Sequence, residues 1–342
     1  MARHPHASSA PAGYVTGVDL GGTKVLAALA DLTGHIVAED VLATDPRGGT
    51  AVAAQIDTLL RGLARRGGVD WSQVRATAVG LPGAPDPETG TVGLSPNVSE
   101  LGAFDVRTEL TRRLGHPVVL DNDVNMAAAG ERWLGSGRTH RHFVFVAVGT
   151  GIGMGIVLDG ELVRGARGAA GEISYLPLGT DPFDPANQIR GALEEAVAGS
   201  ALAARYRTAT GEQVGVPVIF DRAAAGDQAA RAAIDEEARL IALAIAAVTA
   251  VLDPEAVVLG GGIGARVELV EPVRRWVAAL SADVPLIKTS QLGDRAGLLG
   301  AIAVARQQAG AHPGLPAHPD PAASPVTAEL RRNTSFESAE GR

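Results

Sequence analysis

The chain has 342 residues, a formal net charge of −8 at pH 7 and no cysteine. This length suffices for two domains with large cores, and the lack of cysteine excludes disulfides and thiolate-bound metal centres. The acidic balance, without clusters of Lys and Arg interleaved with aromatics, argues against direct nucleic-acid binding. No signal peptide and no membrane-spanning apolar run are present, so we expect a cytoplasmic protein without a membrane partner.

The first half of the chain has the pattern of an α/β domain. Branched and small apolar residues predict β-strands over residues 14–20, 24–31 and 36–44, and helical spacing predicts a helix over 50–66. Short apolar runs at 74–81 and 117–123 are typical of buried strands in a parallel or mixed sheet.

The second half opens with a stretch that repeats the first. "GVDLGGTKVLAALADLTGHIV" and "VAVGTGIGMGIVLDGELV" share one plan of strand, Gly/Thr turn, strand, turn and strand. We therefore predict an internal duplication, with related lobes facing each other across a cleft. A long helix over about 227–252, the buried strand "AVVLGG", the glycine turn "GGIG" and further helices to about residue 308 complete a layered α/β fold.

These patterns divide the chain into four parts. We predict a small α/β domain over 14–120 and a larger α/β domain over 121–308, whose last helix can return to the small domain. Residues 1–13 are small and polar, and residues 309–342 are rich in Pro, Ala and Ser. We expect both of these ends to be disordered.

Two glycine turns are candidate phosphate sites, because backbone N–H groups without a neighbouring Cβ form anion-binding concavities. One contains Gly21, Gly22 and Thr23, and the other spans 149–153. Ordinary hairpin turns are the alternative for each, but their matching places in the duplication favour a shared polyphosphate. The first is not a P-loop, since Thr23 precedes the lysine and a strand follows. The stretch "GGGIGA" at 260–265 fits a dinucleotide fingerprint, or it lines a nucleotide from the other side.

The stretch "VVLDNDVN" places polar residues at the end of an apolar strand, where α/β folds position ligands. An aspartate there can act as a general base on a substrate hydroxyl, and we choose Asp123. Helix capping is the alternative for Asp121 and Asn125. Further along, Glu172 stands alone among small and apolar residues. It can accept from two vicinal sugar hydroxyls, with a surface glutamate as the alternative.

Taken together, these motifs resemble the ROK family of repressors and sugar kinases, over about residues 14–308. The resemblance implies the two-lobed fold of the actin-like ATPases, which is ribonuclease H-like. It implies that "DLGGTK" and "GTGIG" bind phosphates, that Asp19 contacts their Mg²⁺ through water, and that "GGGI" contacts adenosine. It also implies sugar contacts from the Pro82–Gly83 turn, Asn97 and Asn122, with Asp123 as base. The implied substrate residues are Asn97, Asn122, Asp123, Glu172, Tyr175 and Glu194, and the implied nucleotide residues are Asp19, Gly21, Gly22, Thr23, Lys24, Gly149, Thr150, Gly151, Gly153, Gly261 and Gly262.

One departure from the family pattern concerns zinc. Family kinases usually carry Gly-Glu-x-Gly-His and then a Cys-x-Cys-Gly-x-x-Gly-Cys stretch, whose side chains bind structural zinc. Here Tyr175 stands in place of the histidine, and residues 176–194 contain neither Cys nor His. We therefore expect no zinc, and we leave the identity of the sugar open.

The resulting prediction is an ATP-dependent kinase, with Mg²⁺, that phosphorylates a hexose or amino-hexose at O6, and that forms a homodimer as is usual in the family. Polyphosphate stays open as the donor. The alternative is a sugar-binding ROK regulator without catalysis. Such regulators usually carry a winged helix-turn-helix before the first glycine segment, and the 13 residues ahead of Tyr14 are too few for one. An NAD-dependent enzyme using "GGGIGA" is a weaker third reading.

Overall fold

Two five-stranded mixed sheets form the framework of the computed structural model, which describes residues 13–86, 88–93, 105–281 and 283–311. The first sheet has the order β3-β2-β1-β4-β7. Its strands are β1 (Tyr14–Leu20), β2 (Lys24–Asp31), β3 (Ile36–Ala43), β4 (Val74–Leu81) and β7 (Val118–Asn122). The predicted strands of the first half are thus confirmed. The strands β5 (Ala84–Pro85) and β6 (Val92–Gly93) pair with each other in a separate two-stranded sheet, and β5 contacts β7.

The second sheet repeats the topology of the first, with the order β10-β9-β8-β11-β12. Its strands are β8 (Phe143–Val148), β9 (Ile152–Leu158), β10 (Glu161–Val163), β11 (Ala256–Gly260) and β12 (Leu286–Thr289). In both sheets the first strand pairs antiparallel with the second and parallel with the fourth. This common order confirms the predicted two-domain α/β fold.

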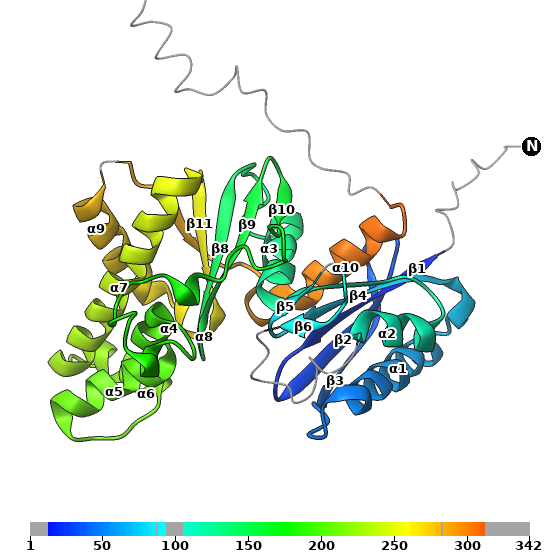
Figure 1. Ribbon diagram of the computed structural model, residues 1–342, viewed down its shortest axis with the longest axis horizontal. Coiled ribbons are helices and arrows are strands. Elements are labelled where there is room, and N and C mark those ends of the chain that lie inside the picture. The colour runs from blue at the N-terminus through cyan, green and yellow to red at the C-terminus, as the bar shows by residue number, and fades with distance from the viewer. Residues whose placement is uncertain (1–12, 87, 94–104, 282, 312–342) are drawn as a thin grey trace, which may run out of the picture. The chain divides into compact units, whose positions relative to one another are not determined.

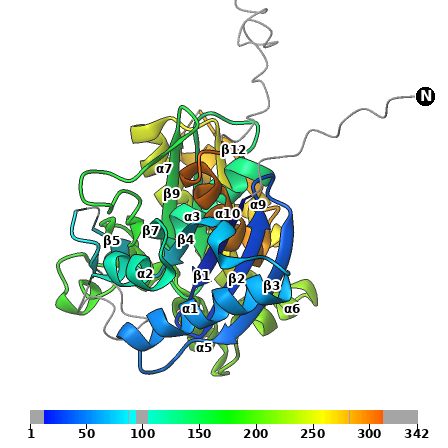
Figure 2. The ribbon, with the colours of Figure 1, turned by 90° about the vertical axis from the view of Figure 1, so that its right-hand side faces the viewer.

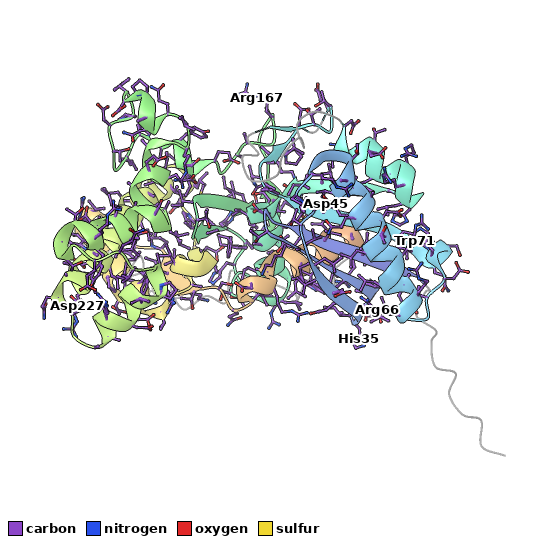
Figure 3. The ribbon with its side chains drawn as sticks, turned by 90° about the horizontal axis from the view of Figure 1, so that it is seen from below. His35, Asp45, Arg66, Trp71, Arg167 and Asp227 are labelled. Atoms are coloured by element: carbon purple, nitrogen blue, oxygen red, sulfur yellow. The ribbon has the colours of Figure 1, made fainter. Side chains whose placement is uncertain are left out.

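Helices cover both faces of the first sheet (Figures 1 and 2). On one face, α1 (Gly49–Arg66) and α2 (Val106–Leu114) bury side chains such as Ile56, Leu60 and Leu110 against Val18 and Val79. Apolar residues recur along α1 at helical spacing, which makes one side of it a packing face. Arg66, the last residue of α1 (labelled in Figure 3), pairs with Asp40 of β3. The other face is covered by α10 (Ala296–Gln308), which packs on β1 and β4.

The second sheet also lies between helices. Figure 1 shows α4 (Ala192–Val197), α5 (Gly199–Thr210), α6 (Val216–Ala224), α7 (Gln228–Leu252) and α9 (Val270–Leu280) on one side of it. Val144 and Val146 of β8 face this cluster, while Phe143 and Phe145 face α3 (Asp123–Leu134) on the other side. This alternation is the period of two that a strand imposes. Short 3₁₀ turns are η1 (Trp71–Gln73), η3 (Ile173–Tyr175), η4 (Pro185–Asn187), η5 (Val267–Leu269) and η6 (Gly293–Arg295).

Two local predictions need correction. The segment "GGIG" is not an open turn but the one-turn helix α8 (Gly261–Gly264). Between α9 and α10, where we expected only helices, the chain forms the strand β12. Its four residues are too few to show a periodic pattern, and pairing with β11 decides their conformation.

The helices α3 and α10 occupy equivalent places in the duplication, after β7 and after β12, and they cross in close contact. A Cβ on Gly300 would lie 1.6 Å from the Met126 carbonyl oxygen, and one on Gly130 would lie 2.3 Å from that of Ala296. The two backbones therefore touch at this crossing. Because α3 begins at Asp123 and α10 begins near Asp19, the crossing fixes the spacing of two predicted site residues.

Two further predictions concern regions at the margins of the fold. Apart from Gly13 and residues 309–311, the ends expected to be disordered lie outside the described residues. Among the helices that the structure describes, none has the length and apolar character needed to cross a bilayer. The boundary between the two predicted domains, at residues 120 and 121, stays a prediction.

Candidate active site

The first glycine turn joins β1 to β2 and is tied down by a residue outside it. The Gly21 amide donates to the Lys24 carbonyl at 2.9 Å, which closes the turn. Thr44, just after β3, donates its hydroxyl to the Gly21 carbonyl at 2.7 Å and its amide to the Thr23 carbonyl at 3.1 Å. Within the described part of the chain, the amides of Gly22 and Thr23 donate to no protein group. This turn therefore offers two consecutive exposed N–H groups to an anion.

The second glycine turn joins β8 to β9 and has the same property. Its Gly149 amide donates to the Gly151 carbonyl at 2.9 Å, while the amides of Thr150 and Gly151 have no acceptor among the described residues. Both turns thus present a pair of unpaired amides at equivalent places in the duplication. Such pairs are the backbone feature that phosphate-binding turns use.

The predicted adenosine segment lies beside the second turn. A Cβ on Gly149 would lie 3.5 Å from the Gly262 nitrogen, so these two backbones approach closely. Gly261 has a φ of 78°, and a Cβ there would lie 2.4 Å from the Val148 carbonyl oxygen. Only glycine combines this dihedral with this approach. The structure therefore brings Gly261 and Gly262 next to the end of β8.

Asn122 is the residue that caps α3. Its Oδ1 accepts from the amides of Val124 at 2.8 Å and Asn125 at 3.4 Å. Helix capping by Asp121 or Asn125, the alternative given above, is wrong. The helix begins at Asp123, so its capping residue is Asn122. The Nδ2 of Asn122 donates to the Gly83 carbonyl at 3.1 Å, which ties the Pro82–Gly83 turn to the strand end.

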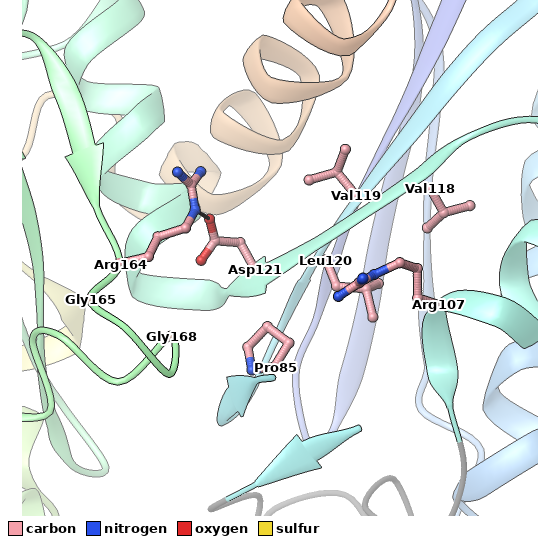
Figure 4. Close-up of a pocket in the computed structure, with 9 residues that line it drawn as sticks. All are labelled: Pro85, Arg107, Val118, Val119, Leu120, Asp121, Arg164, Gly165 and Gly168. Carbon is pink, nitrogen blue, oxygen red and sulfur yellow. Dashed lines mark hydrogen bonds and ion pairs between the residues drawn. The ribbon is translucent and has the colours of Figure 1, made fainter. Parts of the chain in front are cut away.

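Asp121 is held by hydrogen bonds from two side chains. Its side chain is buried and accepts from Asn125 Nδ2 at 2.8 Å and from Arg164 Nε at 2.7 Å. Figure 4 shows Arg164 reaching Asp121 from the segment that precedes Glu172. The two residues border a pocket of about 370 Å³, whose other walls are Pro85, Arg107, Val118, Val119, Leu120, Gly165 and Gly168. None of the predicted site residues that the structure describes lines this pocket, which lies along β7 instead.

Neighbouring carboxylates raise the pKa values of two predicted site residues, Asp123 and Glu172. Burial, together with the charges of Asp19 and Glu172, raises the pKa of Asp123 to about 7. Burial raises the pKa of Asp19 to about 6, against the lowering effect of Lys24. The pKa of Glu172 is raised by burial and by the charge of Glu194. These residues come from β1, α3, the start of η3 and α4, so the fold gathers them from distant parts of the chain.

Asp123 keeps its carboxylate available. Its Oδ1 accepts from the Val124 amide at 2.8 Å, and no side chain of a described residue donates to it. The first turn of a helix favours an anion, but burial and neighbouring carboxylates outweigh that effect here. A carboxylate with a pKa near neutrality is poised to take a proton.

Glycine 297 creates room for Asp19. A Cβ on Gly297, in the first turn of α10, would lie 2.9 Å from the Asp19 carboxylate carbon. Real Cβ atoms essentially never approach so closely, so a side chain here would displace the carboxylate. The positive end of α10 thus faces Asp19.

The remaining predicted sugar residues differ in their surroundings. The Glu172 side chain has no hydrogen-bond partner among the described residues, and Tyr175, in η3, is 44% exposed. Glu194 is engaged with the second turn, since its Oε2 accepts from the Ile152 amide at 3.0 Å. Asn97 lies outside the described residues.

The family follows from comparison with known proteins. The model of the ROK family matches residues 15–308. The chain belongs to the ROK family. This ROK protein is 30% identical over 318 residues to a glucokinase of Streptomyces coelicolor, covering 86% of this chain and 98% of that one.

Solved structures agree with this assignment. The ROK hexokinase of Thermus thermophilus has a TM-score of 0.77 and 32% identity, over 87% of this chain and all of that one. A ROK family glucokinase of Streptomyces griseus, in complex with glucose and AMPPNP, has a TM-score of 0.71 and 30% identity, over 86% and 100% of the two chains. The predicted membership of the ROK family of repressors and sugar kinases is confirmed.

Several supporting residues of this ROK protein carry no signal in a single sequence. Thr44 follows an ordinary edge strand, Arg190 lies in an irregular segment, and Gly297 is one of 43 glycines. Each acts through a contact with a residue distant in sequence, so neither periodicity nor a local motif reveals it.

Proposed function

We propose that this protein is an ATP-dependent sugar kinase that transfers the γ-phosphoryl group to a hydroxyl of a hexose or amino-hexose, with O6 as the acceptor. The observation that carries the proposal is the Asp123 carboxylate at the start of α3. Its pKa is raised to about 7 by burial and by the charges of Asp19 and Glu172. The unpaired amides of the two glycine turns add the groups that a triphosphate needs.

In the proposed reaction Asp123 accepts the proton of the sugar hydroxyl. The hydroxyl oxygen then forms a bond to the γ-phosphorus while the bond from that phosphorus to the β–γ bridging oxygen breaks, and ADP leaves with the electron pair. Donors at Gly22, Thr23, Thr150 and Gly151 would stabilise the charge on the phosphate oxygens. Asn122, Glu172, Tyr175, Glu194 and Asn97 are the proposed sugar contacts.

The carboxylates fit a magnesium ion. Mg²⁺ is usually held by one or two carboxylates together with waters and substrate phosphates. Asp19 and Asp123 are half-buried, burial raises the pKa of both, and the charge of Asp19 raises the pKa of Asp123, all of which a cation would oppose. We assign Asp19 as the residue that would hold Mg²⁺, through water, and the ion would neutralise phosphate charge. In the described segments no cluster of three or more metal-ligating side chains forms, and the absence of zinc stays a prediction.

A sugar-binding regulator without catalysis is the rival reading, because it needs the sugar residues but neither the base nor the nucleotide. Similarity to a glucokinase bound to glucose and AMPPNP favours the kinase. The raised pKa of Asp123 also favours it, since a binding protein gains nothing from a carboxylate that titrates near pH 7.

The test is a coupled ADP-release screen with Mg-ATP over glucose, mannose, N-acetylglucosamine, N-acetylmannosamine, allose and fructose. We expect sugar-dependent ADP release with at least one of them. A parallel set with polyphosphate as donor, read out as sugar phosphate, separates the two donors. Calorimetric binding of a sugar, with no transfer from either donor, would instead identify the regulator.

A further inference from the structure

An arginine that precedes α4 bridges two predicted parts of the site. Arg190 donates its Nε to Glu194 Oε1 at 2.9 Å and its Nη2 to the Thr150 carbonyl at 3.0 Å. Its partner Glu194 accepts from the Ile152 amide through the other carboxylate oxygen, at 3.0 Å. One ion pair therefore holds the second glycine turn at the backbone groups on either side of Gly151.

A hydrogen bond from the start of α5 also holds the second glycine turn. The Gly199 amide, at the start of α5, donates to the Gly149 carbonyl at 2.8 Å. A Cβ on Gly151 would lie 2.2 Å from Glu194 Oε2, so the carboxylate rests directly against the turn. With its carbonyls and the Ile152 amide held, the turn keeps the amides of Thr150 and Gly151 unpaired.

The charges of Arg190 and Glu194 also affect how the turn can bind phosphate. Glu194 lies against a turn that is proposed to bind a triphosphate, and a carboxylate in that place repels phosphate unless a cation compensates it. Arg190 is the cation paired with it, at 2.9 Å, and Glu195 is the second carboxylate near the guanidinium, at 3.8 Å. The Arg190 side chain is 35% exposed, so one edge of it still meets solvent.

We infer that Arg190 is a positioning residue for the nucleotide. It neutralises Glu194 and holds the second glycine turn so that the amides of Thr150 and Gly151 face the phosphates. The inference rests on the proposed function, because it takes this turn as a nucleotide site. It assigns Glu194 a part in phosphate binding beside the predicted contact with sugar.

Charge compensation predicts an unusual order of affinities. Arg190→Gln leaves the Glu194 carboxylate uncompensated beside the phosphates and should weaken Mg-AMPPNP binding about tenfold or more. Arg190→Gln/Glu194→Gln removes both charges, so it should bind more tightly than Arg190→Gln alone, by about threefold or more. An arginine that merely stabilises α4 would not produce such a recovery.

The experiment is isothermal titration of Mg-AMPPNP into the full-length protein and its variants, without sugar. Arg207→Gln is the matched control, because Arg207 is an exposed arginine on α5 whose side chain makes no hydrogen bond or ion pair with a described residue. We expect it to bind like the wild type. Melting temperatures should stay close, since partly exposed ion pairs add little stability.

The outcomes distinguish failure of this inference from failure of the proposed function. Wild-type affinity in Arg190→Gln, or a double variant no tighter than the single one, overturns the inference while leaving the kinase proposal intact. A wild-type protein that binds no Mg-AMPPNP overturns the proposed function and this inference with it. If Arg190→Gln fails to fold, Arg190→Ala and Arg190→Ala/Glu194→Gln take the place of the two variants, and wild-type affinity in the first or no recovery in the second overturns the inference.

Discussion

The pH dependence of catalysis provides a quantitative test of Asp123 as the base. The pKa of this carboxyl is raised to about 7 by burial, by Asp19 and by Glu172. Only the ionised form can accept a proton, so activity should be lost as the pH falls through 7. With that pKa, about 9% of Asp123 is ionised at pH 6 and about 91% at pH 8, which gives a tenfold difference in rate. An ordinary aspartate would be ionised at both values and would give no difference.

The assay measures kcat/KM for the preferred sugar from pH 5.5 to 8.5, with Mg-ATP held well below its KM, because this parameter reports groups of the free enzyme. The perturbation is Glu172→Gln. It removes one of the charges that raise the pKa of Asp123, so the acid limb should move to lower pH even if the sugar binds less tightly.

Protonation of the nucleotide also changes in this pH range, but it is the same for both proteins. The shift between the two profiles therefore belongs to the protein. A flat wild-type profile from pH 6 to 8, or two profiles with the same acid limb, would refute the reasoning.

Three further predictions concern stability and specificity. Gly300→Ala places a methyl group 1.6 Å from the Met126 carbonyl oxygen and should lower the unfolding free energy by about 3 kcal/mol or more, measured by urea denaturation. Gly62→Ala in α1 is the control, because a Cβ there has ample space, and it should be neutral or slightly stabilising. The His116 ring lies 2.7 Å from Thr77 Oγ1, and burial and the Arg61 charge lower the pKa of His116 to about 4. Because the folded protein then resists protonation, the unfolding free energy should fall as the pH drops from about 6.5 to 4, and His116→Gln should remove this decrease. The same decrease in both proteins would contradict the assignment. Tyr175→His should shift the sugar profile towards glucose in the ADP-release screen, and unchanged relative rates would show that position 175 does not select the sugar.

Much of the fold was predictable because its signals are local. Apolar runs of strand length predicted β1 to β4, and the repeated hairpin pattern predicted that the two sheets share one plan. The strand β12 could not be predicted, since Leu286–Thr289 becomes a strand only by pairing with β11. The capping role of Asn122 was missed because it depends on the residue at which α3 begins.

In the site, too, local motifs were predictable and long-range contacts were not. Local motifs predicted the two glycine turns and the carboxylates Asp19 and Asp123, which the fold brings within electrostatic reach of each other. The groups that hold these parts in place, Thr44, Arg190 and Gly297, lie on other elements. Their roles depend on three-dimensional contacts that no pattern along the chain encodes.

The central claim is that Asp123 accepts the proton in phosphoryl transfer, and Asp123→Asn tests it most directly. Asparagine keeps the size of the side chain but cannot take the proton. In single-turnover measurements with Mg-ATP, the transfer rate should fall by about 10²- to 10⁴-fold, while calorimetry should find the Kd for the sugar within a few-fold of the wild-type value. A variant that binds the sugar and still transfers phosphate at a rate within tenfold of the wild type would contradict the account.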